Sequence, residues 1–184
     1  MEKKDILETF PVLETDRLKF IQITSKHLQN LFEIYANEKV MEFYDSYPHS
    51  STIETDKVIA LFEQRFKDKT GIRWGFTIQG ENKIIGTIGF NRFKSDSYAD
   101  LGFDLNENYW NRGIITEAVR TVIHFGFSTL KIHRIEAGVT PGNIASEKVL
   151  LKNGFINEGT IREREFWKGK HQTYLFYSKL STDK

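Results

Sequence analysis

The clearest candidates for a binding site are the residues of a short turn, Arg112-Gly113, between a predicted strand and a predicted helix. Free backbone N–H groups and the positive end of the helix dipole meet at such a helix start. The turn therefore predicts a site for a phosphate or pyrophosphate, although a glycine here is also typical of an ordinary turn. The Arg112 side chain either contacts this phosphate or points to solvent. One buried helix face is indicated after the turn by apolar residues at Ile115, Ala118, Val119, Val122, Ile123 and Gly126.

Composition excludes several other kinds of chemistry. The chain has no cysteine, so disulfides, thiolate metal sites and a cysteine nucleophile are ruled out. No group of His, Asp and Glu has metal-ligand spacing, and we expect no metal. The glycine turn lacks both a Walker lysine and a G-x-G-x-x-G pattern, which argues against a generic nucleotide-binding domain. A net charge of +1, from 26 basic and 25 acidic residues, argues against nucleic acid as a partner.

Length and hydropathy indicate one soluble domain. The 184 residues, 39% of them hydrophobic, suffice for one sizeable core, and we expect a single domain over 1–184 with its core at about 12–180. Neither an internal repeat nor a linker-like segment interrupts the chain. The N-terminus lacks the apolar stretch of a signal peptide, and no segment approaches the run of about 20 apolar residues that spans a bilayer. We expect a cytoplasmic protein that binds no membrane.

The elements that must position the turn alternate between hairpins and helical connections. Helices are predicted by an N-cap at Thr24-Ser25 before a stripe ending at Ala36, by a capping box at 51–54 leading to Gly71, and over about 113–129 and 143–154. Strands are predicted at about 17–23, 74–78, 84–90, 98–105, 135–139, 155–166 and 173–180. This order requires an α/β (α+β) fold, with a mixed sheet covered by helices.

The order of elements, the Arg112-Gly113 turn and the residues Asn143-Ile-Ala-Ser146 and Asn153-Gly154-Phe155 resemble the Gcn5-related N-acetyltransferases (GNAT). The opening 11–18 and the segment 110–118 are similar to the branch that acetylates the N-termini of ribosomal proteins (RimJ- and RimL-like). The resemblance covers about 12–180. It implies a mostly antiparallel mixed sheet with helices on both faces and a splay between the fourth and fifth strands.

The resemblance implies acetyl-coenzyme A as the donor and a primary amine, on a protein N-terminus or a small molecule, as the acceptor. Transfer would be direct, in a ternary complex, by a monomer or a homodimer. The pantetheine would pair with the splayed strand at Phe103 and Leu105, and Lys148 would meet the 3′-phosphate unless it is an ordinary exposed helix lysine. Asn143 would cap its helix and reach the pantetheine or the acceptor. The pyrophosphate would bind the amides of Arg112, Gly113, Ile114, Ile115 and Thr116.

The catalytic groups are less sharply indicated. Many members of the family place a tyrosine acid where this chain has Leu150, so Ser146 or a water is the candidate that protonates the leaving thiolate and also contacts the donor. Glu165 and Asp100 are the preferred candidates for the general base, and a base acting through water is the alternative. The missing tyrosine also motivates a second reading, a non-catalytic acyl-coenzyme A-binding or sensing module on the same fold.

Overall fold

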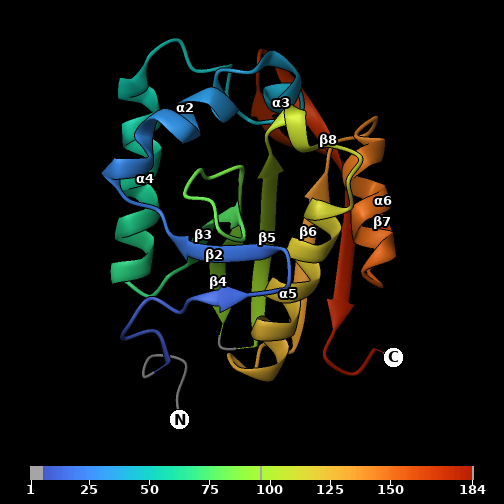
Figure 1. Cartoon of the computed structure of the whole chain (residues 1–184). Helices are drawn as coiled ribbons and strands as arrows, with labels where there is room; N and C mark the ends of the chain where they lie inside the picture. Colours follow the sequence, from blue (N-terminus) through green and yellow to red (C-terminus); the bar gives the residue numbers. More distant parts are fainter. Residues whose placement is uncertain (1–5, 96, 184) are drawn as a thin grey trace.

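The computed structural model describes residues 6–95 and 97–183. An eight-stranded sheet in the order β1-β2-β3-β4-β5-β6-β8-β7 forms its centre (Figure 1). Neighbouring strands are antiparallel except β5 and β6, which are parallel. The strands are β1 (Leu13–Glu14), β2 (Leu18–Gln22), β3 (Ile72–Ile78), β4 (Gly86–Ser95), β5 (Tyr98–Leu105), β6 (Arg134–Val139), β7 (Ile156–Trp167) and β8 (Lys170–Leu180).

Polar side chains satisfy free N–H groups at most of the helix starts. Ser51 and Glu54 form a capping box, and the side chains of Asn37 and Asn143 accept bonds from backbone N–H groups of the first turn. These residues fix where each helix begins. The helices are η1 (Ser25–His27), α2 (Leu28–Tyr35), α3 (Glu38–Met41), α4 (Thr52–Lys67), η2 (Glu107–Tyr109), α5 (Ile114–Ser128) and α6 (Ile144–Lys152).

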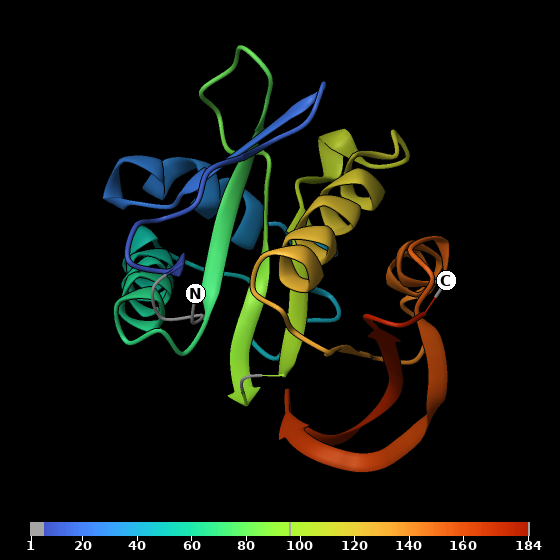
Figure 2. The same ribbon diagram turned by 90° about the horizontal axis from the view of Figure 1, so that it is seen from below.

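Helices cover both faces of the sheet. Trp74 of β3 packs edge-on against Phe125 of α5, with ring centroids 5.6 Å apart. The preceding residue, Arg73, points to the opposite face, and its guanidinium carbon lies 5.5 Å from the ring centroid of Phe62 on α4. Because successive side chains of a strand point to opposite faces, α5 lies on one side of the sheet and α4 on the other. Figure 2 shows the same division, with the blue and teal helices on one side of the central strands and the yellow helix on the other.

The expected fold is confirmed: a mixed, mostly antiparallel sheet lies between helices, and each predicted helix and strand is present. Three details differ. The segment after α2 contains the short helix α3, which begins because Asn37 accepts bonds from the N–H groups of Lys39 and Val40. A two-residue strand, β1, pairs with β2. Strand β4 begins at Gly86 and continues past Phe90, where the pairing with β5 shifts at two irregularities.

Candidate active site

Strands β5 and β6 separate part of the way along the sheet. They pair only where Tyr98, Ala99 and Asp100 face Arg134, Ile135 and Glu136, although β5 continues to Leu105 and β6 to Val139. From Leu101 onward, β5 has no paired strand on its β6 side in the described part of the chain. These two strands are the fourth and fifth of the expected order, so the expected splay is present.

The far end of the splayed strand is tied to the turn that follows it. The indole N–H of Trp110 donates to the carbonyl of Leu105 over 2.8 Å, and the Trp110 side chain is partly exposed. Leu105 itself is buried and Phe103 is half-buried. Sequence reasoning assigned no role to Trp110, because only the folded turn brings its ring back to the strand.

The predicted phosphate turn has the geometry that an anion requires. Gly113 adopts φ 71°, in the left-handed region that favours glycine, and serves as N-cap of α5. Among the described residues, none accepts a hydrogen bond from the N–H groups of Ile114, Ile115 or Thr116. A Cβ added at Gly113 would meet only Arg17, at 3.9 Å. Space above the turn is therefore open, and free donors face a positive helix end, so these residues fit a pyrophosphate.

The Arg112 side chain beside Gly113 is already engaged. The guanidinium of Arg112 lies 5.5 Å from the ring centroid of Tyr109, so this exposed side chain folds back along η2. Its carbonyl accepts from Arg17 at 3.3 Å. The Arg112 side chain thus contacts Tyr109 in this structure, while its backbone holds the turn in place.

Helix α6 lies next to α5 and presents the second group of predicted residues. Asn143 Oδ1 accepts from the N–H of Ser146 at 3.1 Å, which confirms the capping role of Asn143. Ser146 is half-buried, Lys148 is exposed, and Leu150 is fully buried in the core. Leu150, at the position of the family's tyrosine noted above, is thus a core residue.

Asn153, which the sequence marked only as part of the helix end, connects the two helices. Its Nδ2 donates to the carbonyls of Thr116 at 3.3 Å and Val149 at 2.8 Å. Asn153 Oδ1 is buried and has no hydrogen-bond partner among the described residues. The contact with Thr116 holds the first turn of α5 against the last turn of α6, and so helps to fix the phosphate turn.

Asp100, one of the two candidate bases, lies on the other face of the sheet. Asp100 is the last β5 residue paired with β6, opposite Glu136, so it stands where the splay begins. Asp100 shares a strand face with Asp104, whose carboxylate bonds Tyr35 of α2. Ser146 belongs instead to α6, whose apolar residues join the core on the α5 side. Asp100 and Ser146 therefore approach the splay from opposite sides.

Glu165 takes part in a short chain of hydrogen bonds on the C-terminal hairpin. Trp167 Nε1 donates to the Tyr174 hydroxyl over 2.9 Å, and this hydroxyl donates to Glu165 over 3.0 Å. Burial, opposed by the Trp167 bond and supported by the Glu165 carboxylate, raises the pKa of Tyr174. A Cβ added at Gly138 would lie 3.1 Å from the Tyr174 ring. The chain Trp167-Tyr174-Glu165 therefore lies against β6 where β6 leaves β5.

The tip of this C-terminal hairpin contacts α3 and the loop at 44–51 through Lys168. Lys168 donates to the carbonyl of Met41 over 2.7 Å, and its ammonium lies 5.8 Å from the Tyr47 ring centroid. Figure 1 shows the hairpin tip beside α3. Asp45, in the same loop as Tyr47, is close enough to act electrostatically on Lys168 and Tyr174. The loop and the hairpin thus meet, and carboxylates are present on both.

A buried polar network centred on Asp104 lies on the same face of the sheet as Asp100. Asp104 on β5 accepts from Arg73 at 2.8 Å, from Tyr44 at 2.9 Å and from the Thr87 N–H at 2.9 Å. Burial, followed by the Asp104 charge, raises the pKa of Tyr44 well above its ordinary value. Burial opposes the charge of Arg73, but the Asp104 carboxylate, together with Tyr44 and Tyr35, outweighs burial and raises the pKa of Arg73. Arg73 and Asp104 therefore form a buried ion pair, and Tyr44 beside them is protonated.

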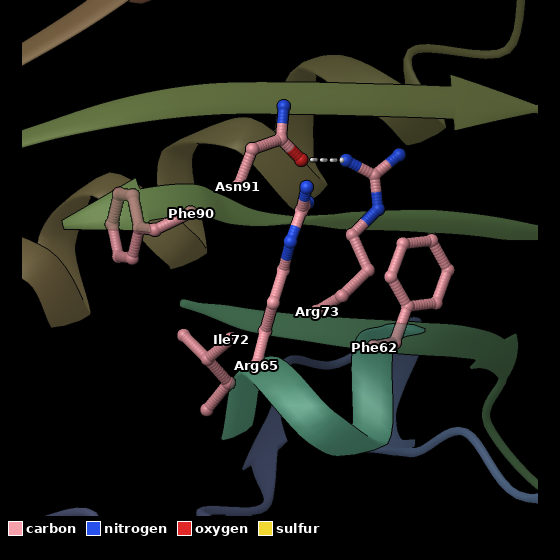
Figure 3. A pocket seen from close by; sticks show the side chains of 6 residues that line it. All are labelled: Phe62, Arg65, Ile72, Arg73, Phe90 and Asn91. Carbon is pink, nitrogen blue, oxygen red and sulfur yellow. Dashed lines mark hydrogen bonds between the residues drawn. The ribbon is translucent and has the colours of Figure 1, made fainter. Parts of the chain in front are cut away.

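Figure 3 shows a second part of this network: Arg73 also donates to Asn91 over 2.9 Å, and the side chain of Arg65 on α4 points toward Asn91. Asn91 and Arg73 also cover Gly102, since a Cβ there would lie 2.4 Å from Asn91 Nδ2. Burial lowers the pKa of Arg65, and the nearby Arg92 and Arg73 add to the effect. The signal that could have indicated this network is Arg73, a charged residue within a largely apolar segment.

Within residues 6–95 and 97–183, no group of three or more His, Cys, Asp or Glu side chains is arranged to hold a metal ion. In the same ranges, no helix combines the length and the apolar character needed to cross a bilayer.

A partly parallel, splayed strand pair that leads into an open glycine turn at a helix start defines an acetyltransferase of the GNAT type. The chain belongs to this family: the model of the acetyltransferase (GNAT) domain matches residues 17–156. An uncharacterized N-acetyltransferase of Bacillus subtilis, YoaA, is 35% identical over 92% of this chain and 96% of its own length. The chain is accordingly an N-acetyltransferase.

More distant relatives include ribosomal-protein acetyltransferases. The ribosomal-protein-serine acetyltransferase of Escherichia coli is 26% identical over 94% of this chain and 97% of its own length. A solved ribosomal L7/L12 alpha-N-protein acetyltransferase in complex with coenzyme A superposes with a TM-score of 0.82. It covers 92% of this chain and 98% of its own, at 19% identity, and so supports the fold.

Proposed function

We propose that this N-acetyltransferase moves the acetyl group of acetyl-coenzyme A directly to a primary amine, with donor and acceptor bound together. The observation that carries the proposal is the continuity of the splay with the open turn at Gly113. An extended pantetheine needs an unpaired strand edge, and a pyrophosphate needs free N–H donors. The splayed β5 supplies the first and the start of α5 supplies the second, in the right order along the chain.

The donor would be held mainly by backbone groups. Phe103 and Leu105 would pair with the pantetheine, and the amides of 112–116 would bind the pyrophosphate. Asn143 and Ser146 would contact the thioester end, and Lys148 would meet the 3′-phosphate. Since most of these donors are backbone groups, the site tolerates Ile115 where the family has a smaller residue. No metal takes part in this proposal.

The acceptor would enter from the opposite face, between the loop at 44–51 and the C-terminal hairpin. An ammonium must lose a proton before its nitrogen can attack the thioester carbonyl carbon. We assign this proton to Glu165, reached through the Tyr174 hydroxyl or a water, because that chain lies beside Gly138 at the splay. Asp100, at the start of the splay, is the second candidate. Closeness of amine and thioester supplies much of the rate.

On the donor side, a C–N bond forms while the C–S bond breaks, and the thiolate takes up one proton. Leu150 cannot donate it, and Ser146 or a water is the remaining candidate. A thiolate needs only modest help, since thiols of this kind have a pKa of about 8.5. The free N–H groups near the splay would polarise the carbonyl.

The acceptor class stays broad in this proposal: a protein N-terminus or a small-molecule amine. The names of relatives such as the ribosomal-protein-serine acetyltransferase support the first. We expect a single domain acting in the cytoplasm, as a monomer or a homodimer. The test is release of free thiol from acetyl-coenzyme A with a panel of N-terminal peptides, polyamines and amino acids. Release that depends on one class of amine supports the proposal, whereas binding without release from any amine would favour the sensing module.

A further inference from the structure

The N-terminal segment contributes an unexpected contact to the phosphate turn. Arg17 Nε donates to Glu117 Oε2 over 2.7 Å, and a second guanidinium nitrogen, Nη2, also bonds this oxygen. Thr15 Oγ1 donates to the other oxygen, Oε1, over 2.6 Å. Arg17 Nη1 reaches the carbonyl of Arg112 over 3.3 Å. Arg17 therefore joins the residue before Gly113 to the first turn of α5.

The segment that carries Arg17 is itself held in a fixed shape. Thr15 and Leu18 are linked by the backbone bond from Thr15 N to Leu18 O over 2.8 Å. The Thr15 hydroxyl oxygen accepts from the N–H of Leu18 over 2.9 Å. β1 and β2 pair on either side of this turn, and β2 pairs with β3 in the sheet. The Arg17 guanidinium therefore extends from a hydrogen-bonded turn, and it reaches a helix roughly one hundred residues away in the sequence.

The charges around this contact create a specific problem for an anionic ligand. Glu117 is an acidic residue in the first turn of α5, the same turn that offers free N–H groups. A carboxylate there is favourable for the helix dipole but repels a pyrophosphate bound at the same end. Arg17 offsets that charge, and its Nη2 lies 3.9 Å from the Cβ position of Gly113, beside the open space above the turn. Half of the Arg17 side chain is still exposed, at 51%.

We propose that Arg17 is a positioning residue of the coenzyme phosphate site: it holds the Glu117 carboxylate away from the pyrophosphate, screens its charge, and fixes the Arg112 carbonyl. Thr15 assists by holding the second carboxylate oxygen. This inference rests on the proposed function, because it assumes that the pyrophosphate binds at Gly113. A planar guanidinium suits the role, since it can bond the carboxylate with two nitrogens while a third reaches a carbonyl.

A purely structural role for the same ion pair predicts different behaviour. In that case Arg17 and Glu117 would only fasten the β1–β2 turn to α5, and loss of either partner would have the same effect. In the proposed role, loss of Arg17 and loss of the Glu117 charge have opposite effects on coenzyme binding. Loss of Arg17 leaves an unscreened carboxylate beside the phosphates, while loss of the Glu117 charge removes the repulsion.

The experiment measures the Kd of coenzyme A by calorimetry at fixed ionic strength, for the wild type, Arg17→Ala, Glu117→Gln and the double variant. We expect Arg17→Ala to weaken binding by about tenfold or more, the size of a lost charge-assisted contact. Glu117→Gln should bind at least as tightly as the wild type. The double variant should recover most of the affinity that Arg17→Ala loses. Equal weakening by both single variants, or no recovery in the double variant, would overturn the proposal.

Two additions make the outcome unambiguous. Dephospho-coenzyme A keeps the pyrophosphate but lacks the 3′-phosphate, so Arg17→Ala should weaken its binding by the same factor. A loss confined to coenzyme A would instead place Arg17 at the 3′-phosphate and contradict the assignment. Arg17→Lys keeps the charge without the fork and serves if Arg17→Ala does not fold. A wild type that fails to bind coenzyme A would refute the proposed function itself, and the inference about Arg17 with it.

Discussion

The indole N–H of Trp110 donates to the carbonyl of Leu105 over 2.8 Å, and this bond joins the end of the splayed strand to the phosphate turn. The strand edge and the free helix N–H groups would bind two parts of one ligand, so their relative position matters. Trp110→Phe keeps the ring but removes the donor. We expect it to weaken coenzyme A binding several-fold and to lower the free energy of unfolding by about 1 kcal/mol. Calorimetry and urea unfolding measure the two effects, and unchanged affinity would show that this bond does not position the site.

Gly113 should be indispensable for donor binding. A β-branched residue disfavours φ 71° and places side-chain atoms in the open space above the free N–H groups. We therefore expect Gly113→Val to abolish the rise in melting temperature that acetyl-coenzyme A produces. Gly80→Val is the matched control, since Gly80 also has positive φ, 82°, in an exposed turn with open surroundings. If both variants retained the rise, the phosphate would bind elsewhere.

The base should be visible in the pH dependence of the reaction. If Glu165 accepts the proton, Glu165→Gln should lower kcat/KM by about 10²-fold and change the shape of its pH profile. Tyr174→Phe should lower it less, because water can replace the hydroxyl. Glu163→Gln, two residues away on the exposed strand, is the control. An unaltered profile in Glu165→Gln, together with a large loss in Asp100→Asn, would transfer the role to Asp100.

The Asp104–Arg73 pair should be important for stability. Asp104→Asn leaves the Arg73 charge buried without its counter-charge, and such a break costs about 3–5 kcal/mol of unfolding free energy. Glu33→Gln is the control, because Glu33 pairs with Lys83 at the surface and exposed pairs contribute about 0–1 kcal/mol. Urea unfolding compares the two variants. Equal, small losses would mean that water reaches the Asp104 carboxylate.

Stability should also fall in mild acid. Burial lowers the pKa of His49 below its ordinary value of 6.5, with Glu54 opposing, and burial likewise lowers the pKa of His27. Below about pH 6.5 the unfolded chain therefore binds more protons than the folded one, so the free energy of unfolding decreases as the pH falls. His49→Gln should make this decrease shallower between pH 7 and 5. An identical slope for the wild type and the variant would exclude His49 as a source.

Local patterns were sufficient to predict the elements that surround the site. The capping box at Ser51 and Glu54, the Asn143 cap and the glycine before α5 each act through neighbours in the sequence, and each is present in the structure. The contacts that organise the site are of another kind. Trp110 reaches back across a turn, and Arg17 meets Glu117 from the distant turn between β1 and β2. Such pairs depend on the sheet order, which residue spacing alone does not determine.

The acceptor side was harder to predict for the same reason. Asp104, Tyr44 and Arg73 come from three separate segments and form one buried network, and no local pattern in the sequence connects them. Glu165 was one of several similar strand carboxylates. Its connection to Tyr174 becomes apparent only when β7 and β8 are paired.

Amide hydrogen exchange with and without acetyl-coenzyme A, followed by mass spectrometry of peptides, tests most directly whether the donor is held across the splay and the Gly113 turn. Amides that bind a pantetheine or a pyrophosphate exchange more slowly in the complex, because their N–H groups become hydrogen-bonded. We expect added protection in two separated segments, 101–105 on the splayed strand and 112–116 around the start of α5. Protection at only one of them, or at neither, would contradict a donor held across the splay and the Gly113 turn.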